Sequence, residues 1–359
     1  MNKCIQTAAL LVAALAMATP GCKKKEESAE APPATPKTAV DTPTEDTPEE
    51  APKVDVNAKL IECWGAWNDR DEAKFGACYG ASSVVTQADG QTFTGPEAII
   101  ANTKQFWTAF PDMKGEVQLT LIKGNMAAAV VYMSGTNTGP MAMPDGSAMP
   151  ATGKKTSNMG IQMFDLTDSA NLQETDFWDM GLMMGQLTEA PGTRPVAEST
   201  GLIEDAPVVA SDSDLEKANI AAVEKHIADF NSMDAAGIAA GFTADSTFSY
   251  TGAPMDMKGT EQITAFYGAM KGAFPDVKVE KTSIWAAGDY VVMHGTMTGK
   301  NTGTMPPMIA KATNKDVSLQ LGEVYKLKDG KISHQWVVSN GMAMAMQLGL
   351  MPEKAADKK

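Results

Sequence analysis

The feature that most constrains this chain is an internal repeat that spans most of its 359 residues. Three short motifs return in the same order: Phe-Pro-Asp at 110–112 and 274–276, Asn-Thr-Gly at 137–139 and 301–303, and Gln-Leu at 186–187 and 347–348. The copies of the first two motifs lie 164 residues apart, and those of the third lie 161 apart. Such ordered matches indicate one domain present twice, with three residues lost from a loop of the second copy.

The repeat places two domains, at residues 57–188 and 214–352. Residues 189–213, which contain several Pro and acidic residues, are predicted to be a linker between them. A short charged tail, 353–359, follows the second domain. Two domains of this size are normal for a chain of this length.

Each copy is predicted to begin with three helices, to continue as paired strands and to end with a short helix. In the first copy Leu60, Trp64 and Trp67 have the spacing of one apolar helix face. Gly-Asp at 288–289 and Asp-Gly at 329–330 are typical of tight turns between antiparallel strands. We therefore expect the α+β class: two tandem cone-shaped domains, each with three helices packed on a curved antiparallel sheet that encloses a hollow.

Residues 1–22 have the layout of an export signal. Lys3 gives a positive start, and the apolar run at 5–18 is too short to span a bilayer as a helix. The small residues before Cys22 resemble the lipobox of bacterial lipoproteins, in which this Cys is lipidated; the alternative is an ordinary secretory signal with an incidental Cys. Residues 23–56 are rich in Pro, Glu and Thr and are predicted to form a disordered tether.

Charge and cysteine content limit the possible partners and chemistry. The net charge of -14 disfavours nucleic acid and other polyanions as partners. Cys63 and Cys78 both fall in the first domain. Because an exported protein meets an oxidising compartment, they either form a disulfide or remain two separate buried thiols.

Several motifs in this order carry a family resemblance: Trp67-Asn68, Phe-Pro-Asp, Gly-Thr-x-Thr-Gly at 135–139 and 295–299, Asp-Gly-Lys-Ile at 329–332 and Gln-Leu-Gly at 347–349. Both copies resemble the SnoaL-like polyketide cyclases, or ester cyclases, of the nuclear transport factor 2-like superfamily. The resemblance implies that a pocket in the cone binds a flat, apolar polyketide ester. It also implies an intramolecular aldol closure without metal or organic cofactor, through an Asp at the end of the last long strand. That place is held by Asp179 in the first copy and by Asn340 in the second.

Two roles are open for Asp179. A carboxyl group in an apolar pocket has a raised pKa and can both remove and return a proton. Asp and Asn are also favoured helix N-caps, and positions 179 and 340 lie where a strand gives way to a helix. Catalysis would confine activity to the first copy, with Asn340 as its degenerate counterpart, whereas capping would explain why Asp and Asn interchange.

Five other residues are candidates for the pocket lining: Trp178, Gln162, Glu323, His294 and Trp336. Glu323 occupies the position of Gln162 in the other copy, and its side chain faces either the hollow or solvent. Asp176 is a weaker acid/base candidate, for which the alternative is an exposed strand position. The three His residues lack metal-ligand spacing, so no metal site is expected from them.

The sequence therefore predicts a lipid-anchored protein of the bacterial cell envelope, on the outer membrane or the periplasmic face of a membrane. Its two domains are expected to bind a small apolar molecule and are candidates for pairing as a pseudo-dimer. In one hypothesis the first domain is an acid/base catalyst of cyclase or isomerase type; in the alternative both domains bind a ligand without catalysis. A weaker third hypothesis is a copper-binding protein, based on its Met-rich segments.

Overall fold

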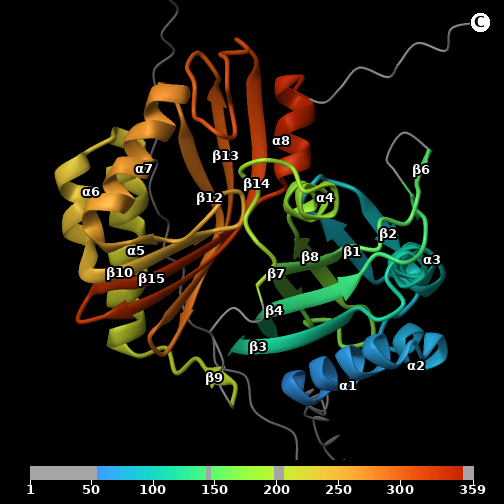
Figure 1. Ribbon diagram of the computed structural model, residues 1–359. Helices are drawn as coiled ribbons and strands as arrows, with labels where there is room; N and C mark the ends of the chain where they lie inside the picture. Colours follow the sequence, from blue (N-terminus) through green and yellow to red (C-terminus); the bar gives the residue numbers. More distant parts are fainter. Residues whose placement is uncertain (1–54, 143–146, 198–205, 351–359) are drawn as a thin grey trace, which may run out of the picture. The chain divides into compact units, whose positions relative to one another are not determined.

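The computed structural model describes residues 55–142, 147–197 and 206–350 (Figure 1). The predicted signal with Cys22, nearly all of the predicted tether and the charged tail lie outside these residues. In the part of the chain that is described, no helix is both long and apolar enough to cross a bilayer.

The first domain packs three helices against one sheet (Figure 1). Its helices are α1 (Val56–Asp69), α2 (Glu72–Gly76), α3 (Gly95–Ala109) and the closing α4 (Met180–Thr188). The strands are β1 (Val84–Gln87), β2 (Thr92–Thr94), β3 (Lys114–Lys123), β4 (Met126–Thr136), β7 (Lys155–Asp165), β8 (Gln173–Phe177) and β9 (Val208–Val209), in the order β2-β1-β8-β7-β4-β3-β9. A separate ribbon joins β5 (Met141–Ala142) to β6 (Ala148–Met149).

The second domain repeats this plan. Helices α5 (Asp214–Ser232), α6 (Ala235–Gly241) and α7 (Gly259–Ala273) lie together beside the sheet (Figure 1), and α8 (Gly341–Leu348) closes the domain. The strands are β10 (Phe242–Tyr250), β11 (Met257–Lys258), β12 (Lys278–Ala287), β13 (Tyr290–Lys300), β14 (Asp316–Lys328) and β15 (Lys331–Val338), in the order β11-β10-β15-β14-β13-β12.

The predicted α+β class with two cone-shaped domains is confirmed, with one difference in strand direction. β1 pairs with β8, and β10 with β15, in parallel, so neither sheet is wholly antiparallel. Turn signals identify hairpins between consecutive strands, but these partners are separated by most of a domain. The parallel pair therefore has no local signal in the sequence.

The repeated Asn-Thr-Gly motif has the same structural role in both copies. Asn137 is buried, and its Nδ2 donates to the carbonyl oxygens of Ala109, at 3.1 Å, and Gly139, at 2.9 Å. Asn301 makes the equivalent bonds at the same distances. A Cβ at Gly139 would lie 1.9 Å from the carbonyl oxygen of Thr108, so only glycine fits there. The motif thus fastens the loop after β4 or β13 to the end of the domain's third helix.

A disulfide joins α1 to the turn after α2. Cys63 and Cys78 are bonded, with their Cα atoms 5.9 Å apart. Each cysteine is followed in the chain by an aromatic residue, Trp64 or Tyr79, whose side chain enters the cavity described below. The bond therefore restrains the two segments that present these side chains.

Candidate functional site

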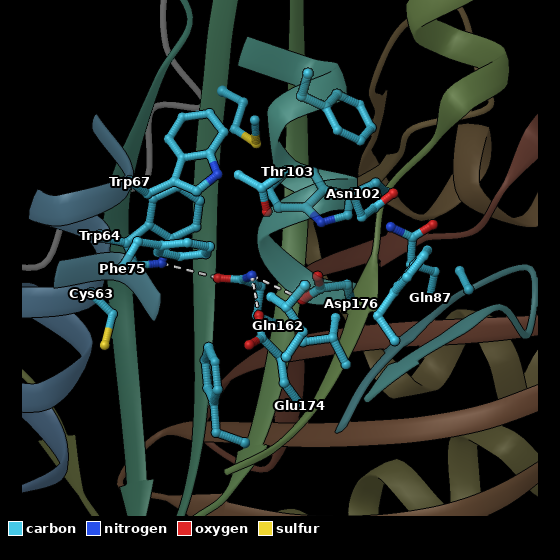
Figure 2. A pocket seen from close by; sticks show the side chains of 18 of the residues that line it. Cys63, Trp64, Trp67, Phe75, Gln87, Asn102, Thr103, Gln162, Glu174 and Asp176 are labelled. Atoms are coloured by element: carbon cyan, nitrogen blue, oxygen red, sulfur yellow. Dashed lines mark hydrogen bonds between the residues drawn. The ribbon is translucent and has the colours of Figure 1, made fainter. Parts of the chain in front are cut away.

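A cavity of about 150 Å³ lies in the first domain between its helices and its sheet (Figure 2). Most of its lining is apolar, and much of that is aromatic: Trp64, Trp67, Phe75, Phe93, Ile99, Phe106, Met133, Phe164, Leu172 and Trp178 contribute. An apolar cavity of this volume can hold a ligand of the size of benzene. The cavity thus has room for about one ring.

Two buried carboxyl groups are among the polar groups that line this cavity. Glu174 and Asp176 are alternate residues of β8, so both side chains point to the same face of the sheet. Glu174 is 5% exposed and Asp176 is 9% exposed. Both side chains line the cavity. Figure 2 shows that they point toward Gln162, which lies on the neighbouring strand β7.

Gln162 holds the two carboxyl groups together. Its Nε2 donates to Glu174 Oε1 and to Asp176 Oδ1, each at 2.8 Å. Its Oε1 accepts a hydrogen bond of 3.0 Å from Trp64 Nε1 on α1. Because an indole N–H can only donate, Trp64 fixes the Gln162 amide in the orientation that directs Nε2 at the acids.

The carboxyl groups are held in conditions that favour a proton. Burial, and next the negative charge of Asp176, raise the pKa of Glu174 well above its ordinary value. Burial also raises the pKa of Asp176. The Tyr79 hydroxyl donates to Glu174 Oε2 at 2.9 Å. Two adjacent buried acids do not both ionise readily, so the pair favours a state with one shared proton, held chiefly by Glu174. The pair can then give one proton and accept one.

The second domain has a smaller cavity, of about 60 Å³, with a single carboxyl group. Glu323 lines it and is 4% exposed. Gln335 Nε2 donates to Glu323 Oε2 at 2.8 Å, and the Tyr325 hydroxyl donates to the same oxygen. Burial raises the pKa of Glu323 to about 7.

Carboxyl and amide have changed places between the two domains. Glu323 in β14 occupies the position of Gln162 in β7, and Gln335 in β15 occupies that of Glu174 in β8. Each domain therefore keeps one cross-strand contact between a Gln and a Glu. Val337 stands where the first domain has Asp176, so the second domain lacks the second acid.

Asp179 and Asn340 cap helices at equivalent positions. Asp179 Oδ1 accepts from the N–H of Leu182 at 3.0 Å and from that of Gly341 at 2.9 Å. Asn340 Oδ1 accepts from two N–H groups of the first turn of α8. Asp179 lines neither cavity, although burial raises its pKa, whereas Asn340 contributes to the lining of the larger one. Of the two roles left open for Asp179, this geometry is that of the N-cap, which the strand–helix junction needs, and it does not place the carboxylate in a cavity as the catalytic role requires.

The other pocket candidates divide into two groups. Trp178 and Gln162 line the first cavity, and Glu323 lines the second. His294 and Trp336 line neither cavity: the His294 Nε2 lies 2.6 Å from Gln320 Oε1, and Trp336 stacks on His334 with ring centres 3.7 Å apart. The prediction that all five candidates line a pocket is therefore corrected for His294 and Trp336, which line neither of these cavities.

Glu174 and Tyr79 are site residues that no sequence motif identifies, and Asp176 is buried where an exposed strand position was the alternative. The signal for the acids is the alternation of Glu174, Asp176 and Trp178, which places all three on one face. Phe177, on the opposite face, is also fully buried, so the alternation does not show which face encloses the cavity.

Among the described residues, no group of three or more His, Cys, Asp or Glu side chains is arranged to hold a metal ion. Met141, from a Met-rich segment, is 5% exposed and packs in an apolar cluster with Phe110, Met183 and Leu187. This environment suits a thioether used as apolar filling.

Comparisons with known proteins agree with the geometry. Residues 221–348 match the family model described as SnoaL-like polyketide cyclase, and residues 60–170 match the model of a SnoaL-like domain. No curated protein matches the chain.

Solved structures similar to the chain each span about two fifths of it. A candidate SnoaL-like polyketide cyclase from Jannaschia sp. CCS1 is 19% identical, covers 39% of this chain and 97% of its own length, and has a TM-score of 0.36. TsrD from Streptomyces laurentii is 18% identical, with coverage of 38% and 97% and a TM-score of 0.34. An LEH-like epoxide hydrolase from M. tuberculosis is 18% identical, with coverage of 38% and 92% and a TM-score of 0.31. The matches to two family models, together with the repeated fold, identify the chain as a tandem SnoaL-like protein with two SnoaL-like domains.

Proposed function

We propose that the first domain binds a small carbonyl compound of about one ring and moves a proton on it through Glu174 and Asp176. The observation that carries this proposal is the pair of buried carboxyl groups, both with raised pKa values, in a cavity whose lining is mostly apolar. The SnoaL-like match supports ligand binding of the polyketide cyclase or isomerase type. Because one fold hosts many functions, the acids carry the proposal and the fold does not.

In the proposed reaction the ionised Asp176 removes a proton from the carbon next to the carbonyl, and the electrons of that C–H bond form an enolate. Glu174 gives its proton to the carbonyl oxygen, so the intermediate is a neutral enol. Asp176 then returns its proton to another carbon of a conjugated enol while Glu174 takes back the O–H proton, which restores the carbonyl and completes an isomerisation. In an aldol closure the carbon instead attacks a second carbonyl, whose oxygen takes the proton from Asp176 while Glu174 takes back the enol O–H proton. A positioned acid and base contribute about 10²–10⁴-fold to such a step.

The test does not require the natural substrate. Cyclohexanone in D₂O reports proton removal directly, because each removal lets deuterium enter next to the carbonyl, and NMR measures the rate. We expect the protein to accelerate this exchange, and Glu174→Gln and Asp176→Asn each to lower the rate about 10²–10⁴-fold. Glu116→Gln, which removes an exposed charge on β3, is the matched control. Acceleration that survives both cavity variants would contradict the proposal.

The competing function is binding without turnover. The hydrogen bonds from Gln162 and Tyr79 satisfy the two acids, as they would in a purely structural network. Under this alternative, cyclohexanone would shift the NMR signals of cavity residues, yet its exchange would be no faster with the unaltered protein than with Glu174→Gln.

We also propose that the chain is a lipoprotein of the bacterial cell envelope, anchored through Cys22. The support is the sequence: a positive start, an apolar run at 5–18 and small residues before the Cys. Bacteria that express the chain and are fed radioactive palmitate should yield labelled protein in the membrane fraction. Cys22→Ser should lose the label; if it stayed labelled, the anchor would be elsewhere.

Finally, we propose that the two domains pair with each other. The hydrogen bond from Gly341 to Asp179 supports this, as does an apolar cluster that includes Phe177, Ile161, Val324 and Trp336. Gly322→Ala tests this pairing, because a Cβ at Gly322 of the second domain would lie 2.5 Å from the ring of Phe177 of the first domain. If Gly322→Ala left stability unchanged, the proposed pairing would be wrong.

A further inference from the structure

We propose that the cavity of the second domain is a binding site for a small primary or secondary ammonium ion of two or three heavy atoms. This site is separate from the acid pair of the first domain, and its test does not depend on any activity of that domain. The proposal rests on the direction of the hydrogen bonds around Glu323, on an unused acceptor on His226, and on the aromatic walls.

Three of the polar groups that line the cavity donate, directly or through one another, toward Glu323. Tyr267 Oη donates to Gln335 Oε1 at 3.0 Å, and Gln335 Nε2 donates to Glu323 Oε2 at 2.8 Å. The Tyr325 hydroxyl donates to the same oxygen. Both donors are directed at one oxygen of Glu323, and an ionised carboxylate can accept both of them. Both bonds fall on Oε2, which leaves Oε1 for a donor in the cavity.

His226 supplies a second acceptor. Its Nε2 lies 3.5 Å from Tyr267 Oη, which already gives its own proton to Gln335. Nε2 therefore carries the imidazole proton and Nδ1 carries the lone pair. Nδ1 is buried, and no group in the described part of the chain donates to it. Burial lowers the pKa of His226 to about 4, so the ring is neutral at pH 6 to 8. Because His226 is one of the residues that line the cavity, its unpaired Nδ1 and Glu323 Oε1 together favour a ligand that donates.

The walls favour a donor that is positively charged. Five aromatic rings line the cavity: Phe230, Phe248, Tyr250, Tyr267 and Tyr325. Aromatic faces attract cations, and ammonium ligands are recognised in this way. Among the described residues that line the cavity there is no Lys or Arg. Burial raises the pKa of Glu323 to about 7, and a bound cation would offset this cost of ionisation.

Size and ligand chemistry narrow the choice further. If about 150 Å³ holds the six heavy atoms of benzene, the cavity of about 60 Å³ holds about two or three. Methylammonium and dimethylammonium have this size and carry N–H donors. Inorganic cations are poor candidates, because Glu323 is the only carboxylate among the described residues of the lining.

The first domain offers a contrast within the same chain. At the position of Glu323 it has the neutral Gln162, and its two acids share a proton. The buried Glu–Gln contact is present in both domains, but only in the second does a lone carboxylate face aromatic rings without a neighbouring acid.

The experiment is a titration of the full chain with dimethylammonium chloride, followed by NMR of ¹³C-labelled Met methyl groups. Met270 and Met297 line the cavity and report occupancy. We expect a dissociation constant on the order of millimolar at pH 8, because so small a ligand makes few contacts. Tetramethylammonium, which has no N–H, and neutral dimethyl ether should each bind at least tenfold more weakly.

The dependence on pH tests the role of the carboxylate. Other titratable groups that face Glu323 are His226 from α5, Tyr250 from β10, Tyr267 from α7 and Tyr325 from β14. The histidine stays neutral between pH 6 and 8, and burial raises the pKa of Tyr250 to about 12 and the pKa values of Tyr267 and Tyr325 well above their ordinary value. Only Glu323 changes charge, so binding should be about tenfold weaker at pH 6 than at pH 8.

A charge-matched pair of variants completes the test. Glu323→Gln, which copies Gln162 of the first domain, should weaken binding at least tenfold, and Glu261→Gln on the exposed surface of α7 should leave it unchanged. Unshifted Met270 and Met297 signals at 100 mM ligand would overturn the proposal. So would equal binding of dimethyl ether, or equal binding at pH 6 and pH 8. The pH comparison uses the unaltered chain, so it decides the matter even if a variant misfolds.

Discussion

Replacing Asp179 with Ala removes the one oxygen atom that accepts hydrogen bonds from two backbone N–H groups. Asp179 Oδ1 accepts from Leu182 at 3.0 Å and from Gly341 at 2.9 Å. Loss of an N-cap costs about 0.5–2 kcal/mol, and the second N–H loses a bond with a net value of about 1 kcal/mol or more. We therefore expect Asp179→Ala to lower the free energy of unfolding by roughly 1.5–3 kcal/mol.

The loss should depend on pH in a defined direction. Burial raises the pKa of Asp179, so the folded state holds this proton more tightly than the unfolded state does. The stability that Asp179 contributes is therefore greatest at low pH and falls as pH rises through its raised pKa. Asp179→Ala should consequently lose more stability at pH 5 than at pH 8.

Urea unfolding, followed by tryptophan fluorescence at both pH values, measures these differences. Asp179→Asn is the matched control, because its Oδ1 can still accept both N–H groups, as Asn340 does in the other domain. We expect Asp179→Asn to stay within about 1 kcal/mol of the unaltered chain and to leave cyclohexanone exchange unchanged. If Asp179→Asn were as unstable as Asp179→Ala, the capping account would be wrong. If exchange fell a hundredfold, Asp179 would have to be the acid/base group.

Three further predictions concern stability. Reduction of the Cys63–Cys78 disulfide, or replacement of both cysteines by Ser, should lower the free energy of unfolding in urea by about 3 kcal/mol. The reason is that the disulfide closes a loop with a sequence separation of 15. An unchanged midpoint of urea unfolding would show that the disulfide does not restrain the unfolded chain. Gly322→Ala places a Cβ 2.5 Å from an aromatic ring and should cost about 1–3 kcal/mol, whereas Gly268→Ala, whose Cβ meets nothing within 4 Å, should not destabilise. The pKa of Glu323 is raised to about 7, so its ionisation between pH 5 and pH 8 destabilises the folded state. Glu323→Gln should therefore reduce the fall in thermal stability over that range. An equal dependence of thermal stability on pH in both proteins would contradict this.

Much of the fold follows from the sequence because the same motifs occur twice in the same order. Asn137 and Asn301 show why such a signal is dependable: each satisfies several backbone groups at once, and the glycine two residues later has no room for a side chain. The parallel pairing of β1 with β8 was not predictable, because it joins distant segments without a turn between them.

The site was predictable only in part. Gln162 and Glu323 were identified because they correspond in the two copies, and both lie in cavities. For Asp179 the sequence left catalysis and capping open, and the strand–helix junction uses its carboxylate as a cap. Glu174 was missed because alternation alone does not distinguish the cavity face from the opposite face, where Phe177 is equally buried.

The central claim is that one proton stays on the Glu174–Asp176 pair at neutral pH. Carboxyl ¹³C NMR of protein labelled at the Glu and Asp side-chain carboxyls measures this directly, with Glu174→Gln and Asp176→Asn to assign the signals. At pH 7 we expect the Glu174 carbon to have the shift of a neutral carboxylic acid and the Asp176 carbon to have that of a carboxylate. If both carbons instead titrated near pH 4 and were fully ionised at pH 7, the pair would have no proton to give, and the proposed chemistry would be wrong.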